Sequence, residues 1–434
     1  MTNARQDAFY LMLLGSIFFA LAGFATQRIS YLGMIDFKEF YSGARCLIEH
    51  HDPYNESDLG AVYHEMANVL PSVPITAVWQ RRNASLTPNF PTTFLLVAPF
   101  ALLPWKLATL LWTILTAAAF ILAAFLMWSL GAPFAPRLSS GLIFLLLVNS
   151  EMLLALGNTA GLVVGLSVIA AWCFLRERFV FAGILSMAFS LAMKPHDAGL
   201  IWLYFLLAGG VLRKRALQTL AVTALLAVPA ILWISHVAPH WPSELHANLA
   251  TITARGGLDD PGPASGGAFG VNMIVCLQTI VSRFRDDPGF YNPIAYLIVA
   301  ALLVPWLIKT LHSRFSPALA WFALAAVVPL AMLPVYHRCY DARLLMLTVP
   351  AFAMLWKNGG PARWCALLLT LAAIVITGDI FWIAVFHFTD YSYNSALAGM
   401  IPAPLILLAL GIFYLWIYLR RDPAAALDAA GADL

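Results

Sequence analysis

The chain has 434 residues, of which 61% are hydrophobic and only 11% are charged. An ordinary soluble domain carries about 25% charged residues, so this composition, with a mean hydropathy of +0.80, indicates a protein whose solvent is largely lipid. The formal net charge of +3 is small and no basic cluster is present, which argues against a nucleic-acid partner. The five cysteines show no CxxC spacing, so we expect no zinc site.

Hydrophobic runs recur along the whole chain, and a bilayer-spanning helix takes about 20 apolar residues. The first run lacks a small-residue cleavage site, so we interpret it as a retained anchor. The sequence therefore predicts a single all-α polytopic membrane domain over 1–434 with about twelve spans. The expected spans are 9–26, 105–130, 139–156, 159–175, 179–193, 197–212, 216–236, 291–311, 317–334, 343–357, 364–386 and 399–420.

The basic residues of the short loops, such as Arg213, Lys214 and Arg215, fall on one side of this trace. By the positive-inside rule that side is cytoplasmic, so we expect a plasma (inner) membrane protein with both termini inside. The long loops 27–104 and 237–290 then face outward. The second contains a run of chain breakers from 256 to 270, which predicts a mobile segment. We expect the small-residue tail 422–434 to be disordered and cytoplasmic.

Asp36 begins a predicted amphipathic helix in the first outer loop. Apolar residues recur at helical spacing from Phe37 onward. With Glu39 three positions later, Asp36 is close to a capping box, so one interpretation is that it caps the helix. The other is that it acts as a general base for a hydroxyl group at the membrane surface, and the two roles are compatible. A second amphipathic stretch covers 59–70, and the apolar run 94–103 is too short to span.

A dense polar cluster interrupts the hydrophobic runs at 336–343. Arginine binds phosphate bidentately and keeps its charge in a partly dry place, so one interpretation is a clamp for a phosphate leaving group. The alternative is an exposed loop in which Asp341 pairs with an arginine. The density of polar residues between membrane helices favours the phosphate site. Its expected phosphate-binding residues are Arg338, Arg343 and His337.

Two further positions carry candidate roles. Lys194 and His196 stand between two short hydrophobic runs, where both side chains could reach one anionic ligand. The alternative for Lys194 is that it extends to lipid head groups. Asn158 either orients a sugar or caps the next helix, and capping is the expected role.

An ordered set of short segments runs through the first half of the chain. The segments are Asp36-Phe37, Tyr41, Ala44, Asp52-Pro53-Tyr54, Asn89-Phe90-Pro91, Pro99, Leu103-Pro104, Trp112, Gly157-Asn158, Ala182-Gly183 and Lys194-Pro195. On these segments, up to about residue 215, the chain resembles the polyprenyl-phosphate-mannose-dependent mannosyltransferases of glycosyltransferase family 87, membrane enzymes of the GT-C fold. It departs from them at Asn89-Phe90-Pro91-Thr92, where a Tyr-Pro-Pro-like stretch is expected, and at Gly157-Asn158, where a Gly-Gln-like pair is expected.

The resemblance implies inverting transfer of a sugar, expected to be mannose, on the outer face. The donor would be a polyprenyl-phosphate sugar, the acceptor a glycolipid or glycan, and Asp36 the base, with Asp341 as the rival base. The first outer loop has no Asp-x-Asp pair, so we expect no metal and no cofactor besides the donor. The expected substrate-binding residues are Glu39, Tyr41, Asn89, Asn158, Tyr340 and Asp341.

Two other function classes remain open at this point. One is a GT-C enzyme that moves another sugar, such as a pentose or an aminosugar. The other is a transporter or flippase for a lipid-linked sugar. Transporters usually hold their polar sites near the membrane midplane and show internal repeats, whereas the polar clusters of this chain gather at the expected outer face. The oligomeric state does not follow from the sequence.

Overall fold

The computed structural model describes residues 3–30, 33–67, 86–257, 259–264, 274–388 and 403–421. Within these ranges every regular element is helical, apart from one isolated β-bridge between Ile274 and Arg338. All five cysteines are free thiols. The expected breaker run 256–270 is described only in part, and the tail 422–434 lies outside the described residues.

Seven helices are long and apolar enough to cross a membrane by length and composition. This is the architecture of an all-helical polytopic membrane protein, and the seven coincide with seven of the twelve expected spans. They are α1 (Asn3–Ile29), α6 (Trp105–Gly131), α7 (Pro136–Val148) continued by α8 (Glu151–Leu156), α9 (Thr159–Arg176), α12 (Gly210–Val237), α16 (Pro288–His312) and α22 (Ala403–Arg420).

The other expected spans correspond to shorter helices, so a count of twelve is not confirmed. The expected span 364–386 is interrupted at Thr377 and Gly378, and the span 343–357 begins in a 3₁₀ helix. These shorter elements are α10 (Val180–Met193), α11 (Pro195–Leu207), α17 (Pro317–Ala331), η1 (Cys339–Thr348), α18 (Val349–Asn358), α19 (Ala362–Ile376) and α20 (Asp379–Phe388).

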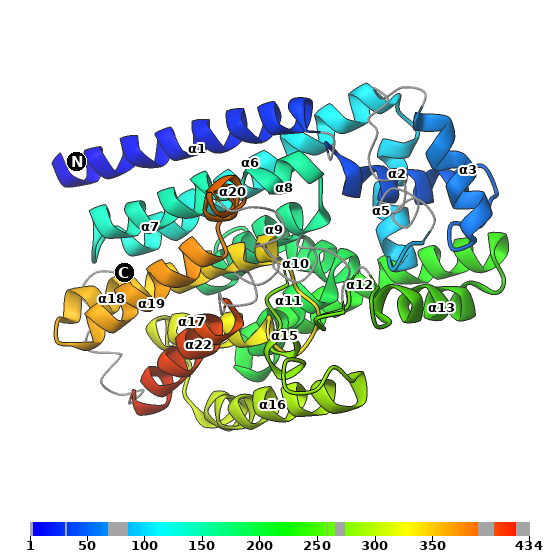
Figure 1. The fold of residues 1–434 in the computed structure, drawn as a ribbon. Coiled ribbons are helices and arrows are strands. Elements are labelled where there is room, and N and C mark those ends of the chain that lie inside the picture. The colour runs from blue at the N-terminus through cyan, green and yellow to red at the C-terminus, as the bar shows by residue number, and fades with distance from the viewer. Residues whose placement is uncertain are drawn as a thin grey trace.

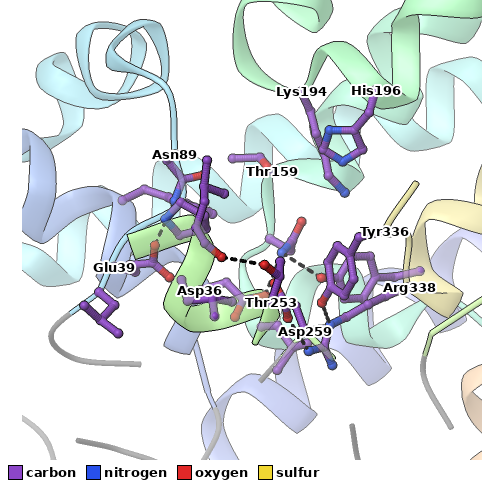
Figure 2. Close-up of a pocket in the computed structure, with 18 of the residues that line it drawn as sticks. Asp36, Glu39, Asn89, Thr159, Lys194, His196, Thr253, Asp259, Tyr336 and Arg338 are labelled. Atoms are coloured by element: carbon purple, nitrogen blue, oxygen red, sulfur yellow. Dashed lines mark hydrogen bonds and ion pairs between the residues drawn. The ribbon is translucent and has the colours of Figure 1, made fainter. Parts of the chain in front are cut away.

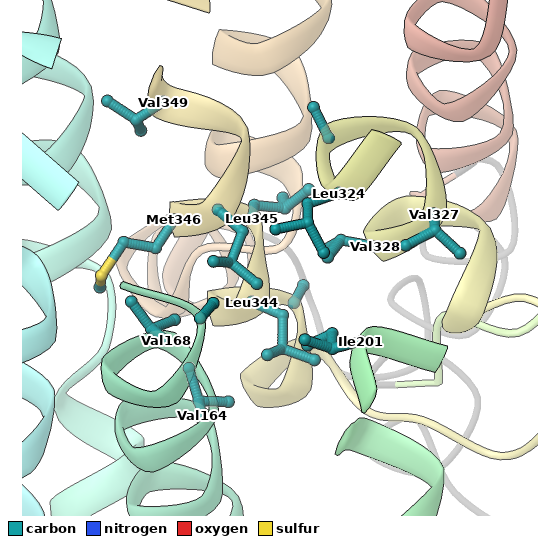
Figure 3. Packing of buried hydrophobic residues seen from close by; sticks show 14 of the residues in the cluster. Val164, Val168, Ile201, Leu324, Val327, Val328, Leu344, Leu345, Met346 and Val349 are labelled. Carbon is teal, nitrogen blue, oxygen red and sulfur yellow. The ribbon is translucent and has the colours of Figure 1, made fainter. Parts of the chain in front are cut away.

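The main core surrounds α17, whose residues from Leu319 to Ala331 are all buried. Helix α17 packs against α22, α11 and η1, and η1 in turn packs against α9. Figure 3 shows the branched side chains of α9, α17 and η1 meeting in this core. Every residue of η1 is buried, although a 3₁₀ helix of ten residues is unusually long. The segment that leads into η1 is therefore held by packing on several sides.

The outer helices keep apolar side chains exposed on one face. On α12, Leu225 is 72% exposed, and on α1, Leu21 is 65% exposed. Helix α1 covers α7 and α8 with its other face. Exposed leucines on long apolar helices are what a lipid-facing surface requires.

A second, smaller core fixes the helices of the first long loop. Helix α2 (Ile35–Ile48) packs against α5 (Pro91–Ala101) and α3 (Glu56–Ala67). With α13 (Trp241–Thr253), these helices gather at one end of the molecule (Figure 1). The Phe37 ring is fully buried, with ring centroids 4.8 Å from Trp112 and 5.7 Å from Trp105. Aromatic contacts of this kind add to area burial, so the start of α2 is firmly anchored to α6.

The amphipathic helices expected in the first loop are present, with different bounds. Helix α3 covers part of the expected stretch 59–70, whose last residues lie outside the described ranges. The apolar run 94–103 lies largely in α5, which packs against α2, α12, α10 and α6. The second long loop begins with α13 and also contains a single helical turn, α15 (Gln278–Val281).

Candidate functional site

A cavity of about 650 Å³ opens beside the first turn of α2, within the range of about 300–1,000 Å³ found for small-molecule sites. Its walls come from α2, the segment before α5, the start of α9, the α10–α11 junction, the end of α13 and the segment before η1 (Figure 2). Segments far apart in the sequence therefore meet at one place. Of the residues expected from the sequence, the cavity is lined by Asp36, Glu39, Asn89, Asn158, Lys194, His196, Arg338 and Tyr340.

Asp36 lies in the first turn of α2 but does not cap it, so the expectation of a helix cap is wrong. The N-cap is Met34, in the left-handed region at φ 58°, and it makes no side-chain cap hydrogen bond. Its backbone N–H donates to the carbonyl oxygen of Ala155 at 2.7 Å. The start of α2 is thus tied to α8 by the backbone, which leaves the Asp36 carboxylate free to face the cavity.

Gly157 makes this close approach possible. It ends α8 at φ 67°, and a Cβ atom there would lie 2.7 Å from the Phe37 Cβ. Its carbonyl oxygen accepts a 2.9 Å hydrogen bond from Trp112 Nε1. A residue with a side chain at this position would be strained and would push α2 away.

Asn158 joins three parts of the site. It is the N-cap of α9, as expected, with Oδ1 accepting from the Ala160 N–H at 2.8 Å. Its Nδ2 donates to Asp36 Oδ2 at 2.7 Å and lies 3.2 Å from the Tyr340 hydroxyl. One amide therefore caps a helix and orients a carboxylate.

Opposing influences act on the protonation of Asp36. Burial raises its pKa, while the hydrogen bond from Asn158 lowers it. The positive charges of Arg338 and Lys194 also lower the pKa, although the net result is still a rise above the usual value. A carboxyl group with a raised pKa is a stronger base once ionised, which is the property that a general base needs.

Glu39 forms a second polar position on the α2 wall. Its Oε1 accepts a 2.7 Å hydrogen bond from Asn89 Nδ2, which also contacts Thr87. Burial, followed by the neighbouring charge of Asp36, raises the pKa of Glu39 to about 8. The backbone of Asn89 is held in turn by the Tyr54 hydroxyl, which donates to its carbonyl oxygen at 2.6 Å. Below pH 8, Glu39 is mostly a neutral group that can both donate and accept hydrogen bonds.

Arg338 supplies the guanidinium group of the cavity. Its Nη2 lies 3.1 Å from Asp259 Oδ1, and its Nε donates to the Tyr336 hydroxyl (Figure 2). The backbone N–H of Arg338 donates to Asp341 Oδ2 at 2.8 Å. Only 12% of the Arg338 side chain is exposed. A cation already paired with a carboxylate at a cavity wall is suited to exchange that carboxylate for an anionic ligand.

Lys194 lies at the junction of α10 and α11, where it precedes Pro195 at the first position of α11. Its Nζ pairs with Asp341 Oδ1 and, at 3.2 Å, with Asp197 Oδ2. Burial alone would lower the pKa of Lys194, but the two carboxylates raise it overall. The lysine is therefore a fixed positive charge at the cavity wall. The alternative, in which Lys194 extends freely to lipid head groups, is wrong.

Four of the expected site residues do not line the cavity. The Tyr41 hydroxyl donates to the Leu103 carbonyl oxygen at 2.7 Å. Asp341 and His337 lie behind the wall, both fully buried. Arg343 is also fully buried, 3.2 Å from Asp379 Oδ1 and 2.6 Å from the Thr377 carbonyl oxygen. Its expected contact with a donor phosphate is thus not supported, and the alternative of an exposed loop over 336–343 is wrong as well.

Three residues that bind the cations of the site had been given no role of their own from the sequence. Asp259 faces Arg338 from the Gly- and Pro-rich run after α13. Tyr336 binds the Arg338 side chain, and Asp197 binds Lys194. The sequence contains one indication for Asp259, which is an acidic residue within a run of glycines and prolines. Its pairing with an arginine 79 residues away could not be predicted from neighbouring residues.

Comparison with known proteins identifies no relative. No protein-family model, no curated protein and no solved structure matches the chain.

Proposed function

We propose that the protein is a membrane glycosyltransferase that moves a sugar, mannose in the first instance, from a polyprenyl-phosphate donor to a hydroxyl group of a glycolipid or glycan. Asp36 is the base in this proposal, and the site faces the outer side of the plasma membrane. The observation that carries the proposal is that the Asp36 carboxylate and two fixed cations, Arg338 and Lys194, line a single cavity.

The reaction follows from this combination of charges. The acceptor oxygen attacks the anomeric carbon while Asp36 takes the proton of the acceptor hydroxyl group. The bond from that carbon to the phosphate oxygen breaks, and polyprenyl phosphate leaves with the bonding electron pair. A single displacement inverts the configuration at the carbon and needs one base, whereas a retaining route needs a second carboxylate as nucleophile.

The two ends of the cavity suit the two substrates. Arg338 and Lys194 stabilise the negative charge that develops on the leaving phosphate. On the opposite wall, Glu39 and Asn89 offer hydrogen-bonding groups next to Asp36, as recognition of a polyhydroxylated acceptor requires. Apolar residues such as Leu249, Ile252 and Ile383 line the remainder and suit a prenyl chain.

The test is a donor screen with purified protein in lipid nanodiscs, using labelled polyprenyl-phosphate sugars and a crude glycolipid acceptor fraction. We expect transfer with at least one donor and a loss of rate of about 10²–10⁴-fold in Asp36→Asn, the usual contribution of a general base. Asp7→Asn is the matched control, since Asp7 is an exposed residue paired with Arg137 on the surface.

Two outcomes would count against the proposal in different ways. Near-normal transfer by Asp36→Asn would remove Asp36 as the base and leave the transferase assignment standing. No transfer with any polyprenyl-phosphate sugar, combined with movement of a lipid-linked sugar across the bilayer of proteoliposomes, would favour a transporter.

A further inference from the structure

Two histidines and an aspartate meet behind the Lys194 wall of the cavity. His196 and Asp197 open α11, and His337 precedes η1. Their ligating atoms all lie within 4.8 Å of one another. His196 lines the cavity, while the side chains of Asp197 and His337 are fully buried.

The buried atoms of this cluster have few partners. Asp197 Oδ2 pairs with Lys194 Nζ at 3.2 Å. Asp197 Oδ1 and His337 Nε2 face each other at 3.1 Å, and neither atom has another hydrogen-bond partner among the described residues. Buried polar atoms need a hydrogen on one side or a cation between them, so this pair calls for a proton or an ion.

The position of the hydrogen on the His337 ring gives a second reason to expect a cation in this cluster. Its Nδ1 lies 3.0 Å from the carbonyl oxygen of Val335, and because a carbonyl only accepts, Nδ1 carries the hydrogen. In the neutral ring, Nε2 therefore presents a lone pair to Asp197 Oδ1 at 3.1 Å. Two acceptors at this distance repel unless a cation lies between them. A ring nitrogen that donates to a backbone carbonyl while the other faces the site is the usual arrangement of a metal-binding histidine.

Asp197 divides its two oxygens between two tasks. Oδ2 pairs with Lys194 at 3.2 Å. Oδ1 faces both histidines, 3.1 Å from His337 Nε2 and 3.8 Å from His196 Nε2. Ligands at about 2.0–2.1 Å from a tetrahedral zinc ion lie about 3.3 Å apart, so both separations are close to those of a first coordination shell. Lys194 then holds the carboxylate from behind, as outer-shell partners of metal ligands do.

We propose that His196 Nε2, Asp197 Oδ1 and His337 Nε2 bind a divalent transition-metal ion, with zinc as the best match for two imidazoles and one carboxylate. Three protein ligands leave a fourth coordination position open. This position faces the cavity, because His196 is exposed to the cavity. The ion adds positive charge beside Lys194, on the wall assigned above to the donor phosphate. The metal site itself stands whether or not that assignment holds. The competing occupant is a proton on His337 Nε2 shared with Asp197.

The test measures metal binding directly and needs no substrate. Full-length protein, freed of any affinity tag and stripped with a chelator, is titrated with Zn²⁺ and separately with Co²⁺ in detergent. We expect one ion per chain and the visible absorption of four-coordinate Co²⁺. Because His196 is partly exposed, His196→Ala preserves the fold, and His337→Gln is the second variant. Loss of an outer-shell partner weakens metal binding about 10–100-fold. Each of these variants removes a direct ligand, so each should weaken Zn²⁺ binding by more than that.

His246→Ala is the matched control, since His246 is exposed on α13, and it should bind like the wild type. The proposal is overturned if the wild-type protein binds less than one ion per chain at micromolar Zn²⁺. It is overturned equally if His196→Ala, eluting as a monodisperse peak like the wild type, binds Zn²⁺ unchanged. Both results are independent of sugar transfer, so a failure here is separate from a failure of the proposed activity.

Discussion

The side-chain amide of Asn158 donates from Nδ2 to Oδ2 of Asp36 at 2.7 Å while its Oδ1 caps α9. The two residues are 122 positions apart in the chain. A cap is rigid because its backbone position is set by the helix that it begins. The orientation of the proposed base is therefore coupled to the start of a membrane-spanning helix.

Replacement of Asn158 should separate its two tasks. Asn158→Ala loses the cap, which costs about 1 kcal/mol of stability, and it also loses the donor to Asp36. Asn158→Ser keeps a good cap, so its thermal unfolding should resemble that of the wild type. In both variants the loss of the hydrogen bond raises the pKa of Asp36 further, so the acidic limb of the pH–rate profile should move to higher pH. An unchanged profile in Asn158→Ser would contradict the coupling.

Glu39 should make stability depend on pH. Its pKa rises from 4.5 in the unfolded chain to about 8 in the fold, so the stabilisation from the neutral carboxyl group is complete below pH 4.5. It is lost as the pH rises through about 8. In Glu39→Gln this loss is absent, so at pH 8.5 the variant should be about 1–2 kcal/mol more stable than the wild type. This difference is smaller than the full pKa shift implies, because solvent in the open cavity screens the charge.

Thermal unfolding in detergent from pH 5 to pH 9 measures the effect. Glu49→Gln is the control, because Glu49 is a part-exposed residue paired with Arg45. Its pH dependence should match that of the wild type. Parallel curves for Glu39→Gln and the wild type would show that Glu39 is ionised throughout the range.

Gly157 should tolerate no side chain. Gly157→Ala puts a Cβ atom 2.7 Å from the Phe37 Cβ at a positive φ of 67°, and we expect a loss of about 1–3 kcal/mol. Because the displaced element is α2, transfer activity should fall together with stability. Gly141→Ala is the matched control, since a Cβ at Gly141 meets nothing within 4 Å and alanine favours the helix. Equal melting temperatures for the two variants would refute this explanation.

Asp259 should compete with an anionic ligand for Arg338. Removing its charge in Asp259→Asn leaves the guanidinium group unpaired, so polyprenyl phosphate should bind about tenfold more tightly, as charged hydrogen bonds of about 1.5–3 kcal/mol allow. Arg338→Ala should weaken binding by a comparable factor or more. Arg137→Ala, on the surface, is the control. Calorimetric or fluorescence titration of nanodisc-bound protein measures these affinities, and weaker binding by Asp259→Asn would contradict the competition.

Arg343 should matter for stability and little for the ligand. Arg343→Met leaves Asp379 buried without its partner, which costs about 3–5 kcal/mol. The double variant Arg343→Met with Asp379→Leu should recover most of that loss, because an apolar pair replaces the ion pair. Affinity for polyprenyl phosphate should stay within about 0.5 kcal/mol of the wild type in Arg343→Met. A large loss of affinity would return Arg343 to the binding site.

Local patterns predicted the parts of the molecule that depend on neighbouring residues. The long apolar runs predicted the spanning helices because backbone groups in lipid must be satisfied within a helix. Asn158 followed by a helix-forming run predicted a cap, and the cap is present. Helical periodicity likewise predicted α2. The interruption of apolar segments at Asn149 and at Thr377 was missed, since composition does not mark a break inside a hydrophobic run.

The candidate site depended on long-range packing. The sequence by itself determined that Asp36, Lys194 and Arg338 are polar residues in a membrane protein. Only the tertiary structure decided that these three share a cavity and that Arg343, five positions after Arg338, does not. The physical reason is that η1 turns a short polar segment into the core, where Arg343 finds Asp379, while Asp36 is moved to the cavity by the burial of Phe37 against α6. Packing and charge pairing between segments far apart in the chain decide which polar side chains reach the cavity. A local sequence pattern therefore cannot predict it.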